Sequence, residues 1–587
     1  MTSCSSKFSQ TAVGYCLIIS LLGILIFANH LNNPFQFDSV PYITNNEKLK
    51  KPETLLTSEF LQKEFIDRGL LRISIAFNVY LDGFKPFGFH LLSLAFHILN
   101  ALLLFFIFEK CFQGFNLSAL GWSKKRIRNV SFFAAVLFLC HPIQTESVIY
   151  IMSRSEVMAS TFYLIGFLLF QHLLKRTSTS GLQYSFYFLI ILLIILLGFS
   201  VKQIVATLPA SMIFYYFFSC PNNSPSWQFL KKWKWPLVVI CSALASLFFY
   251  KLFTDEAFLV GPSRTDQMVG RVKYMLSQPY VVIFYYLKKI FFPINLNIDP
   301  DIEVVINVFS SSFLIPLLCI IFLLVGSFRV FKTRVIFFFL CWFFIILSPS
   351  SSIVTLHDLA AEHRTYLASA GIFFLLAYGT SEILNEFGKT QPLKIMLIFC
   401  FLVGTLGVLT IKRNTVWKSE LSLWQDSFKK SPYKLRPLIN LARAHSLLGD
   451  TEKAIQYYHE ALNRGPLIFA VNYNLGDLYM KKGLVLDAIK RFLVATRISP
   501  ETPETFARLG DIYLSQKNFK LANSYFKHAV ELNPRFSIGF KNLGILNFYH
   551  LNNPKQGIIY FTRSLTLDPH QPEADNIRLL LSEYSGR

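Results

Sequence analysis

Ionisable side chains occur at the ends of apolar segments in this sequence, in places where a membrane protein usually carries few of them. An ionisable group at bilayer depth costs about 2.5–3.5 kcal/mol on insertion scales, so such groups usually serve a function. Arg and Lys can neutralise a phosphate, and a carboxylate can take a proton from an attacking hydroxyl. The set indicates transfer of a group from an anionic lipid, and its members are Asp38, Arg68, His90, His141, Glu146, Arg154, Glu156, Lys202, Glu362, His363 and Arg364.

Each of these residues also has an ordinary structural interpretation, which the sequence leaves open. A loop acid can simply be solvated, a cation can anchor a helix end in the headgroups, and an acid and a base can pair for structure. The residues concerned are Asp38 as a solvated acid, Arg68 and Lys202 as anchors, His141 before Pro142 as a helix cap, and Arg154 with Glu156 as an ion pair. No Ser-His-Asp spacing, P-loop or dinucleotide-binding fingerprint competes with the transfer hypothesis.

The amino-acid composition indicates that these ionisable groups belong to a membrane protein. Of the 587 residues, 53% are hydrophobic and only 16% are charged, which excludes a purely soluble fold. The net charge of +22 is typical of cytoplasmic loops rich in Lys and Arg, so no nucleic-acid partner is expected. The nine Cys lie in or beside apolar segments, without zinc spacing, and predict no disulfide framework.

Apolar runs long enough to span a bilayer occur only in the first 412 residues. We predict about eleven spans, near 12–29, 87–108, 130–141, 156–174, 184–199, 204–219, 236–251, 307–327, 335–349, 365–383 and 394–411. The first one lacks a small-residue cleavage site and is interpreted as an uncleaved anchor.

The segment 276–292 decides the orientation. If it crossed the membrane, the basic turn at 328–334 would face outward, against the positive-inside rule. We therefore interpret it as an interfacial or re-entrant helix. The N-terminus is then cytoplasmic, the part after residue 412 is extracytoplasmic, and the ionisable residues share the outer leaflet.

The C-terminal part repeats with a period of 34 residues. Gly476, Gly510 and Gly544 are one period apart, and so are an aromatic position and a terminal proline, namely Tyr458, Phe492, Phe526 and Phe561, and Pro466, Pro500, Pro534 and Pro569. The last repeat carries one extra residue near Asn552–Asn553. This is the tetratricopeptide pattern. Small residues let the two helices of a hairpin approach, and we expect the aromatic side chain to fill the gap to the next hairpin.

The predicted fold is therefore all-α, a polytopic membrane domain followed by a repeat solenoid. The membrane domain covers 1–412, with outer loops at 31–86 and 252–306. A half repeat or linker covers 413–435, four repeats cover 436–570, and a capping segment covers 571–587. Such solenoids present a concave groove that binds a peptide or protein.

Several stretches of the membrane domain resemble one known family. They are FQFDSVPYITNN with Asp38, RGLLRISIAFNVYLDGFKPFGFHLLSLAFHILNALL with Arg68 and His90, CHPIQTESVIYIMSRSEVMAS with His141, Glu146, Arg154 and Glu156, SVKQ with Lys202, and AAEHRTYLASAGIFF with Glu362, Arg364 and Tyr366. The chain resembles the transmembrane and tetratricopeptide-repeat-containing family of O-mannosyltransferases in the GT-C superfamily, as a prokaryotic relative.

The resemblance implies a polyprenyl- or dolichyl-phosphate sugar as donor and a Ser/Thr hydroxyl of a protein as acceptor. It implies that Asp38 is the catalytic base and that the donor phosphate lies between Arg154, Lys202 and Arg364, with help from Arg68. The other residues expected to bind substrate are His90, His141, Glu146, Glu156, Glu362 and Tyr366. Because Ser39 stands where the family has a second acid, no metal site is expected.

Two other functions stay open from the sequence. The chain could be a non-catalytic scaffold that assembles envelope proteins on its repeats. A transporter or lipid carrier is less favoured, because the charged groups gather at one face instead of the midplane. The absence of glycosylation sequons in the predicted outer loops favours a bacterial inner membrane over the endoplasmic reticulum.

Overall fold

The computed structural model describes residues 10–46, 49, 68–115, 121–174, 181–219, 269–330, 334–352, 354–387 and 392–585. Within these ranges every regular element is a helix, as the all-α prediction requires. The chain forms two compact units, Met1–Ser431 and Pro432–Arg587.

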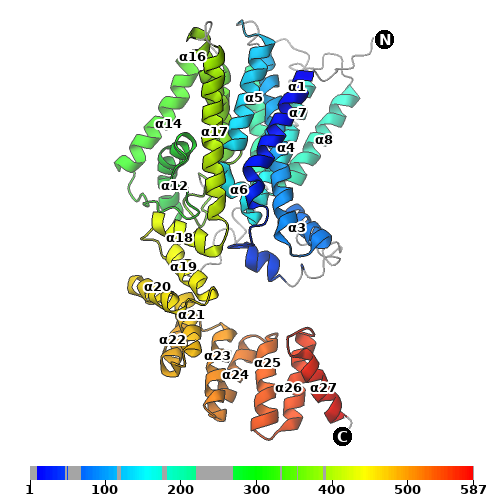
Figure 1. Cartoon of the computed structure of the whole chain (residues 1–587), viewed down its shortest axis with the longest axis vertical. Helices are drawn as coiled ribbons and strands as arrows, with labels where there is room; N and C mark the ends of the chain where they lie inside the picture. The colour runs from blue at the N-terminus through cyan, green and yellow to red at the C-terminus, as the bar shows by residue number, and fades with distance from the viewer. Residues whose placement is uncertain are drawn as a thin grey trace. The chain divides into compact units, whose positions relative to one another are not determined.

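The first unit is built from long apolar helices (Figure 1). Those long and apolar enough to cross a membrane include α1 (Gln10–Phe27), α4 (Pro86–Gly114), α7 (Arg154–Leu174), α8 (Gly181–Phe199), α14 (Ser311–Val330) and α17 (Pro392–Val416). A bent pair, α5 (Lys124–Cys140) with the segment Pro142–Ile149, adds one more candidate. Helices are suited to this setting because all their backbone hydrogen bonds lie within the segment. The unit is a polytopic membrane protein.

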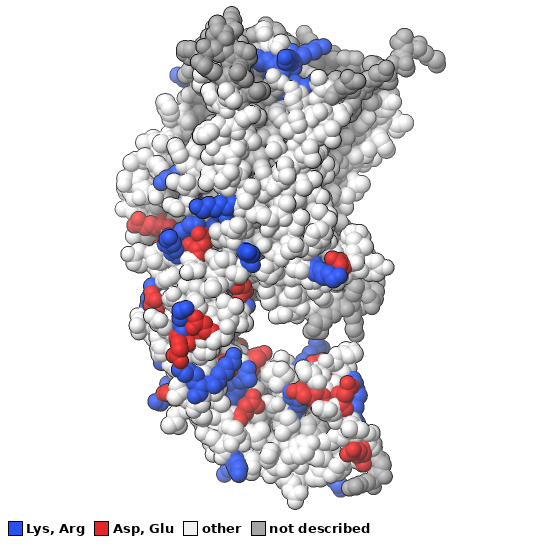
Figure 2. Space-filling model, viewed as in Figure 1, with Lys and Arg blue, Asp and Glu red and all other residues white. Residues whose placement is uncertain are grey.

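The predicted spans coincide with described helices, except 236–251, which lies outside the described residues. Three of the helices at predicted spans are shorter or less apolar than the six long helices named above. They are α9 (Leu208–Ser219), α15 (Arg334–Leu347) and α16 (Ser369–Phe387). The ambiguous segment 276–292 is helical up to Phe291, through α12 (Arg271–Tyr280), the π-helix η9 (Val281–Leu287) and α13 (Lys288–Phe291). On the face drawn in Figure 2, basic residues lie at one end of the long helices and a broad uncharged band follows.

Short elements at one end of these helices position the polar residues. In Figure 1, α3 (Gly69–Asp82), α6 (Thr145–Ile149) and α18 (Glu420–Lys430) lie at the same end of the helices. The 3₁₀ segments η7 (Ile151–Ser153), η8 (Gln203–Thr207) and η10 (Glu362–Thr365) interrupt the chain where it enters or leaves a long helix. Helix α4 packs on α5 and α7, and α5 also packs on α16.

The second unit consists of helical hairpins that follow the 34-residue period. They are α19 (Leu435–Leu447) with α20 (Thr451–Arg464), α21 (Phe469–Lys481) with α22 (Val485–Ile498), α23 (Pro503–Ser515) with α24 (Phe519–Leu532), and α25 (Ser537–Ile545) and η11 (Leu546–His550) with α26 (Pro554–Leu567), followed by α27 (Ala574–Ser585). The predicted half repeat at 413–435 is divided, since α18 belongs to the first unit.

The aromatic position contacts both the next hairpin and its own. Phe492 joins Leu509 of the next hairpin in one buried cluster, as expected. A Cβ at Gly510 would lie 2.5 Å from the Phe526 ring, and one at Gly476 would lie 2.7 Å from Phe492, so the ring also covers the glycine of its own hairpin. The first repeat has the buried Ala442 at this position instead of glycine.

The extra residue of the last repeat lies in a helix. In the hairpins, one turn position has a left-handed backbone, at Gly449, Gly483, Lys517 and Asn552. The spacing is 34 up to Lys517 and 35 to Asn552, and the π-helix η11 lies in between, at Leu546–His550. A single π turn absorbs one inserted residue. The extra residue therefore lies within η11, a few positions before Asn552–Asn553, near which the sequence analysis placed it.

Candidate active site

Charged side chains of the first unit form one continuous row. It begins at Lys202, the residue before η8. The Lys202 ammonium pairs with Glu156 Oε1 of α7. Glu156 Oε1 lies 4.0 Å from His363 Nε2, and His363 Nδ1 lies 2.6 Å from Glu146 Oε1. His363 thus bridges two acids from α6 and α7. Both carboxylates are almost fully buried, so the imidazole and the ammonium offset a large desolvation cost.

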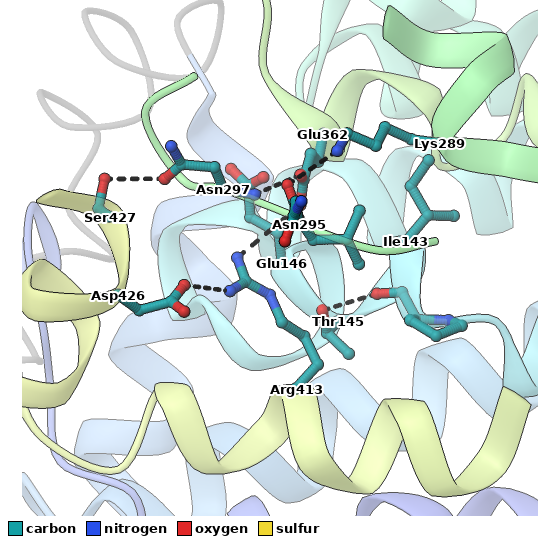
Figure 3. A network of polar contacts seen from close by, with 12 residues as sticks. Ile143, Thr145, Glu146, Lys289, Asn295, Asn297, Glu362, Arg413, Asp426 and Ser427 are labelled. Atoms are coloured by element: carbon teal, nitrogen blue, oxygen red, sulfur yellow. Dashed lines mark hydrogen bonds and ion pairs between the residues drawn. The ribbon is translucent and has the colours of Figure 1, made fainter. Parts of the chain in front are cut away.

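The row continues from η10 to the end of α17 (Figure 3). Glu362 Oε2 lies 3.9 Å from Arg413, whose other guanidinium nitrogen lies 2.7 Å from Asp426 of α18. Asp426 also pairs with Lys430 at 2.6 Å. We call the eight residues the charged row: Lys202, Glu156, His363, Glu146, Glu362, Arg413, Asp426 and Lys430.

Glu362 is the acid with the most perturbed environment in this row. It is fully buried, and its Oε1 accepts hydrogen bonds from the Tyr285 hydroxyl at 3.1 Å and the Asn297 N–H at 2.6 Å. Burial, opposed by the charge of Arg413 and assisted by that of Glu146, raises the pKa of Glu362 to about 7. Glu362 is therefore a carboxyl group that can hold a proton near neutral pH.

Three cations gather at the Lys202 end. Burial lowers the pKa of Lys202, Glu156 opposes this, and the positive charges of Arg68 and Arg364 lower it further. Arg68 is exposed and has a left-handed backbone, with φ of 60°, at the start of α3. Arg364 donates to the carbonyls of Asp358 and Leu359 and to the Tyr274 hydroxyl. Positive charge is therefore concentrated at this end, where Glu156 and Asp358 are the acids that offset part of it.

Asp38 adjoins the same region through Tyr150. Asp38 follows Phe37, a non-glycine residue with a φ of 53°, in the loop after α1. Burial raises the pKa of the Tyr150 hydroxyl well above its usual value, and the charges of Asp38 and Glu146 raise it further. Tyr150 therefore lies within electrostatic reach of both the predicted base and the charged row. Strained backbone at Phe37 and Arg68 is typical of functional loops.

Three other predicted site residues bond inside the protein. Arg154 is fully buried and donates to the Phe89 carbonyl at 2.9 Å, to Ser93 Oγ and to Ser74. His141 contacts the Ile290 carbonyl at 2.9 Å and accepts from the Ile143 N–H. The Tyr366 hydroxyl contacts His97 and Asn100. These three hold helices together, and none of the hydrogen bonds described for them reaches a side chain of the charged row.

His90 lies apart from both the charged row and the three residues described above. Its Nε2 lies 2.9 Å from the Asn33 carbonyl, and the ring is almost fully buried against His30. The structure places His90 on the wall of a small cavity that Tyr150 also lines. It therefore lies next to the Asp38 loop and not at the cationic end.

Sequence reasoning left Tyr150, Arg413 and Asp426 out of the candidate set. Arg413 and Asp426 lie after the last predicted span, outside the motifs that were quoted. The signal for Tyr150 was present, since it stands between Glu146 and Arg154 in the quoted motif. Among the described residues no group of three or more His, Cys, Asp or Glu is arranged to hold a metal ion.

Comparison with curated proteins gives matches along the chain. Protein O-mannosyl-transferase TMTC3 of Mus musculus is 22% identical over 94% of this chain and 63% of its own length. TMTC4 of Mus musculus is 22% identical over 75% of this chain and 65% of its own. Protein O-mannosyl-transferase F38B6.6 of Caenorhabditis elegans is 24% identical over 77% of this chain and 62% of its own. The matches thus span less than two thirds of these relatives.

The repeats are identified independently. Two family models, both described as tetratricopeptide repeat, match residues 439–503 and 503–536. Among solved structures, MamA 41-end from Desulfovibrio magneticus RS-1 covers 26% of this chain and 85% of its own, with 20% identity and a TM-score of 0.24. YrrB, described as a TPR protein with an unusual peptide-binding site, covers 34% of this chain and 97% of its own, with 16% identity and a TM-score of 0.24.

The family models and the curated relatives agree with the architecture described above. The relatives are named as protein O-mannosyl-transferases, and the models find the repeats in the second unit. The chain is similar to protein O-mannosyl-transferases over most of its length, and it carries tetratricopeptide repeats in its C-terminal part.

Proposed function

We propose that the chain is an integral-membrane glycosyltransferase. It moves a mannose-like sugar from a polyprenyl-phosphate donor to a protein hydroxyl on the extracytoplasmic face of the membrane, a bacterial inner membrane in preference to the endoplasmic reticulum. The observation that carries this proposal is that the charged row has the positive charges of Arg68 and Arg364 near Lys202 at one end, and that Tyr150 lies within reach of the charges of both Asp38 and Glu146 of the row. The similarity to protein O-mannosyl-transferases supports the same reaction.

The reaction assigns a separate task to each end of this region. The acceptor oxygen attacks the anomeric carbon of the sugar while Asp38 takes the hydroxyl proton. The bond between that carbon and the phosphate oxygen breaks, and the lipid phosphate leaves with the bonding electron pair. Arg68, Lys202 and Arg364 stabilise the charge that develops on this phosphate. A single direct displacement inverts the anomeric carbon.

The charged row would keep these groups in place. His363 connects the carboxylates of Glu146 and Glu156, so it links the acid beside Tyr150 to the acid that holds Lys202. We assign Glu146, Glu156 and Glu362 to positioning, because each contacts other protein groups. The repeats would hold the acceptor protein, as such grooves bind peptides.

Sugar transfer by membranes that contain the full chain tests the proposal. The assay supplies a radiolabelled polyprenyl-phosphate sugar and a Ser/Thr-containing acceptor protein. We expect Asp38→Asn to lower the rate by about 10²–10⁴-fold, the usual contribution of a general base. Asp82→Asn is the matched control, since Asp82 is an acid at the end of α3 whose side chain pairs with Lys85 at 3.1 Å.

Full activity of Asp38→Asn would exclude Asp38 as the base. If the wild-type chain transfers no sugar, and substitutions in the repeats alone abolish its cellular phenotype, the chain is instead a membrane-anchored scaffold that assembles proteins.

A further inference from the structure

A small cavity lies directly beside the loop that carries Asp38. Its walls come from the loop after α1, from α4, from the connection between α6 and η7, and from the residue after α17. We call it the loop cavity, and its lining residues are Asn33, Pro34, Gln36, Ser39, His90, Ile149, Tyr150, Ile151 and Trp417. None of these residues is Lys, Arg, Asp or Glu. The walls of the loop cavity are therefore polar, and a formal charge there would require protonation of His90.

The lining contains an unusual concentration of unpaired polar atoms. Six buried atoms have no hydrogen-bond partner: Asn33 Nδ2, Gln36 Oε1, Ser39 Oγ, His90 Nδ1, the Tyr150 hydroxyl and Trp417 Nε1. All six residues are more than nine-tenths buried. Native proteins contain only a few such atoms per hundred residues, because a buried donor or acceptor without a partner is destabilising. Six around one cavity indicate that its occupant completes their hydrogen bonds, and the Tyr150 hydroxyl, like that of Ser39, can both donate and accept.

The neighbouring hydrogen bonds fix which of these atoms donate and which accept. His90 Nε2 lies 2.9 Å from the Asn33 carbonyl and must donate to it, so Nδ1 of the neutral ring is an acceptor. Gln36 Nε2 donates to the Trp417 carbonyl at 2.5 Å, which leaves Oε1 as an acceptor. Asn33 Nδ2 and Trp417 Nε1 can only donate, and Ser39 can do both.

This pattern selects a chemical class of ligand. A phosphate or carboxylate would meet two acceptors, and an ammonium would meet two donors with no acid to neutralise it. A hydroxyl donates one hydrogen bond and accepts others, so it matches the lining without a charge. Lining by aromatic residues with a few placed polar groups is also typical of small-molecule sites.

The loop cavity adjoins the predicted base through a rigid aromatic wall. Tyr150 stacks on Trp417 with ring centroids 5.7 Å apart, and Phe37 lies 5.9 Å from Tyr150. The charge of Asp38 raises the pKa of the Tyr150 hydroxyl, and Ser39 directly follows Asp38 in the chain. An occupant of the loop cavity is therefore next to the group that would take the acceptor proton.

We propose that the loop cavity is a subsite for a neutral hydroxyl of the substrate, with Trp417 and Asn33 donating to it and His90 and Gln36 accepting from it. This inference rests on the proposed function. The hydroxyl belongs either to the sugar of the lipid-linked donor or to the acceptor alcohol, which share this chemistry. His90 then serves in hydroxyl recognition, apart from the phosphate.

Binding of sugar without transfer provides the first test. The purified full chain in detergent is titrated with a short-chain alkyl mannoside and with its deoxy analogues, each of which lacks one hydroxyl. We expect the wild type to bind at least one deoxy analogue about tenfold more weakly than the mannoside. Trp417→Phe keeps the ring but removes the N–H, and we expect it to weaken mannoside binding about tenfold and to abolish that preference.

Trp342→Phe is the matched control. Trp342 is also buried, but its Nε1 already donates to the Leu367 carbonyl at 3.2 Å, so its loss should leave sugar preference unchanged. Ser39→Ala is the second variant, because it removes one unpaired hydroxyl with a minimal change of volume. It keeps the test valid if Trp417→Phe does not fold.

A second arm distinguishes the two sources of the hydroxyl. If the variants leave sugar binding unchanged but raise the KM for the acceptor about tenfold in the transfer assay, the acceptor alcohol occupies the loop cavity. If neither quantity changes, water alone fills it and the proposal is wrong. Sugar binding that depends on Trp417, without transfer from any donor, would support the subsite while contradicting the proposed function.

Discussion

The charged row and the loop cavity adjoin the same residue, Tyr150, but they treat buried polarity in opposite ways. In the charged row, buried carboxylates such as Glu146 and Glu156 have a cation or an imidazole beside them. In the loop cavity, uncharged atoms such as Ser39 Oγ and Trp417 Nε1 have no partner at all. The difference teaches that the charges of the row are paired within the protein, with Glu362 Oε2 and Arg413 Nε as its atoms that lack a hydrogen bond, while the polar atoms of the loop cavity gather around one space that an occupant can fill.

The largest effect should follow from breaking the row at Arg413. Arg413→Met leaves Glu362 and Asp426 without their shared cation, and breaking one partner of a buried pair costs about 3–5 kcal/mol. We expect the melting temperature of the purified full chain to fall sharply. The double variant Arg413→Met with Glu362→Gln should recover part of that loss. A melting temperature equal to that of the wild type would show that the row does not stabilise the fold.

The pH dependence of stability should identify Glu362. Its pKa is raised from 4.5 to about 7 in the folded chain, so between these values the folded state binds the proton that the unfolded state releases. The contribution of Glu362 to stability is therefore fully present below pH 4.5 and is lost as the pH rises through about 7. The full gap corresponds to about 3 kcal/mol.

Glu362→Gln should remove this slope while keeping an acceptor for Tyr285 and Asn297. Melting temperatures of the wild type and the variant across that pH range measure it. Glu303→Gln, at an exposed acid, is the control and should keep the wild-type slope. Parallel curves for the wild type and Glu362→Gln would contradict the assignment.

At the cationic end, Lys202→Met should weaken use of the lipid-phosphate donor. A hydrogen bond to a charged group contributes about 1.5–3 kcal/mol, so the KM for the donor should rise about 10–100-fold. Lys85→Met provides the comparison, because Lys85 is exposed and pairs only with Asp82 among the ion pairs described. If Lys202→Met leaves the KM for the donor unchanged, the cationic end does not bind the donor phosphate.

The smallest effect concerns the unpaired atoms themselves. Ser39→Ala in the ligand-free chain removes a buried hydroxyl that has no partner, so stability should stay the same or rise by about 1 kcal/mol. Ser427→Ala removes an equally buried hydroxyl that donates to Asn297 Oδ1 at 2.8 Å, so it should lower stability. Thermal unfolding of the two variants side by side measures the contrast. Equal losses would mean that Ser39 already has a partner.

The repeats show how far local pattern reaches. The positions of Gly476, Gly510 and Gly544 predict helical hairpins because each hairpin repeats the same short-range packing. The pattern could not say which ring covers which glycine, since Phe526 is equally close in sequence to helices on either side. It could not locate the inserted residue either, because a π turn in η11 leaves no mark in the spacing apart from one added position.

The candidate site was only partly accessible from the sequence. Several ionisable residues beside apolar segments were selected, and of these Glu146, Glu156, Lys202 and Glu362 lie in the charged row. The charges of Arg68 and Arg364 reach Lys202, and that of Asp38 reaches Tyr150. Arg154, His141 and Tyr366 were selected on the same grounds, but their side chains bond to carbonyls or hydroxyls within the helix bundle. Residue type and position are the same in both groups, so only the direction of the side chain separates them.

The sequence by itself determined that the chain is all-helical, that its first part is apolar enough for a membrane, and that its second part repeats every 34 residues. These properties depend on neighbours along the chain, through periodicity and hydrophobicity. Tertiary structure alone decided that His363 joins Glu146 to Glu156 and that Trp417 closes a cavity with Asn33. Such contacts join residues hundreds of positions apart, and they form only when packing of the helices brings their ends to one place.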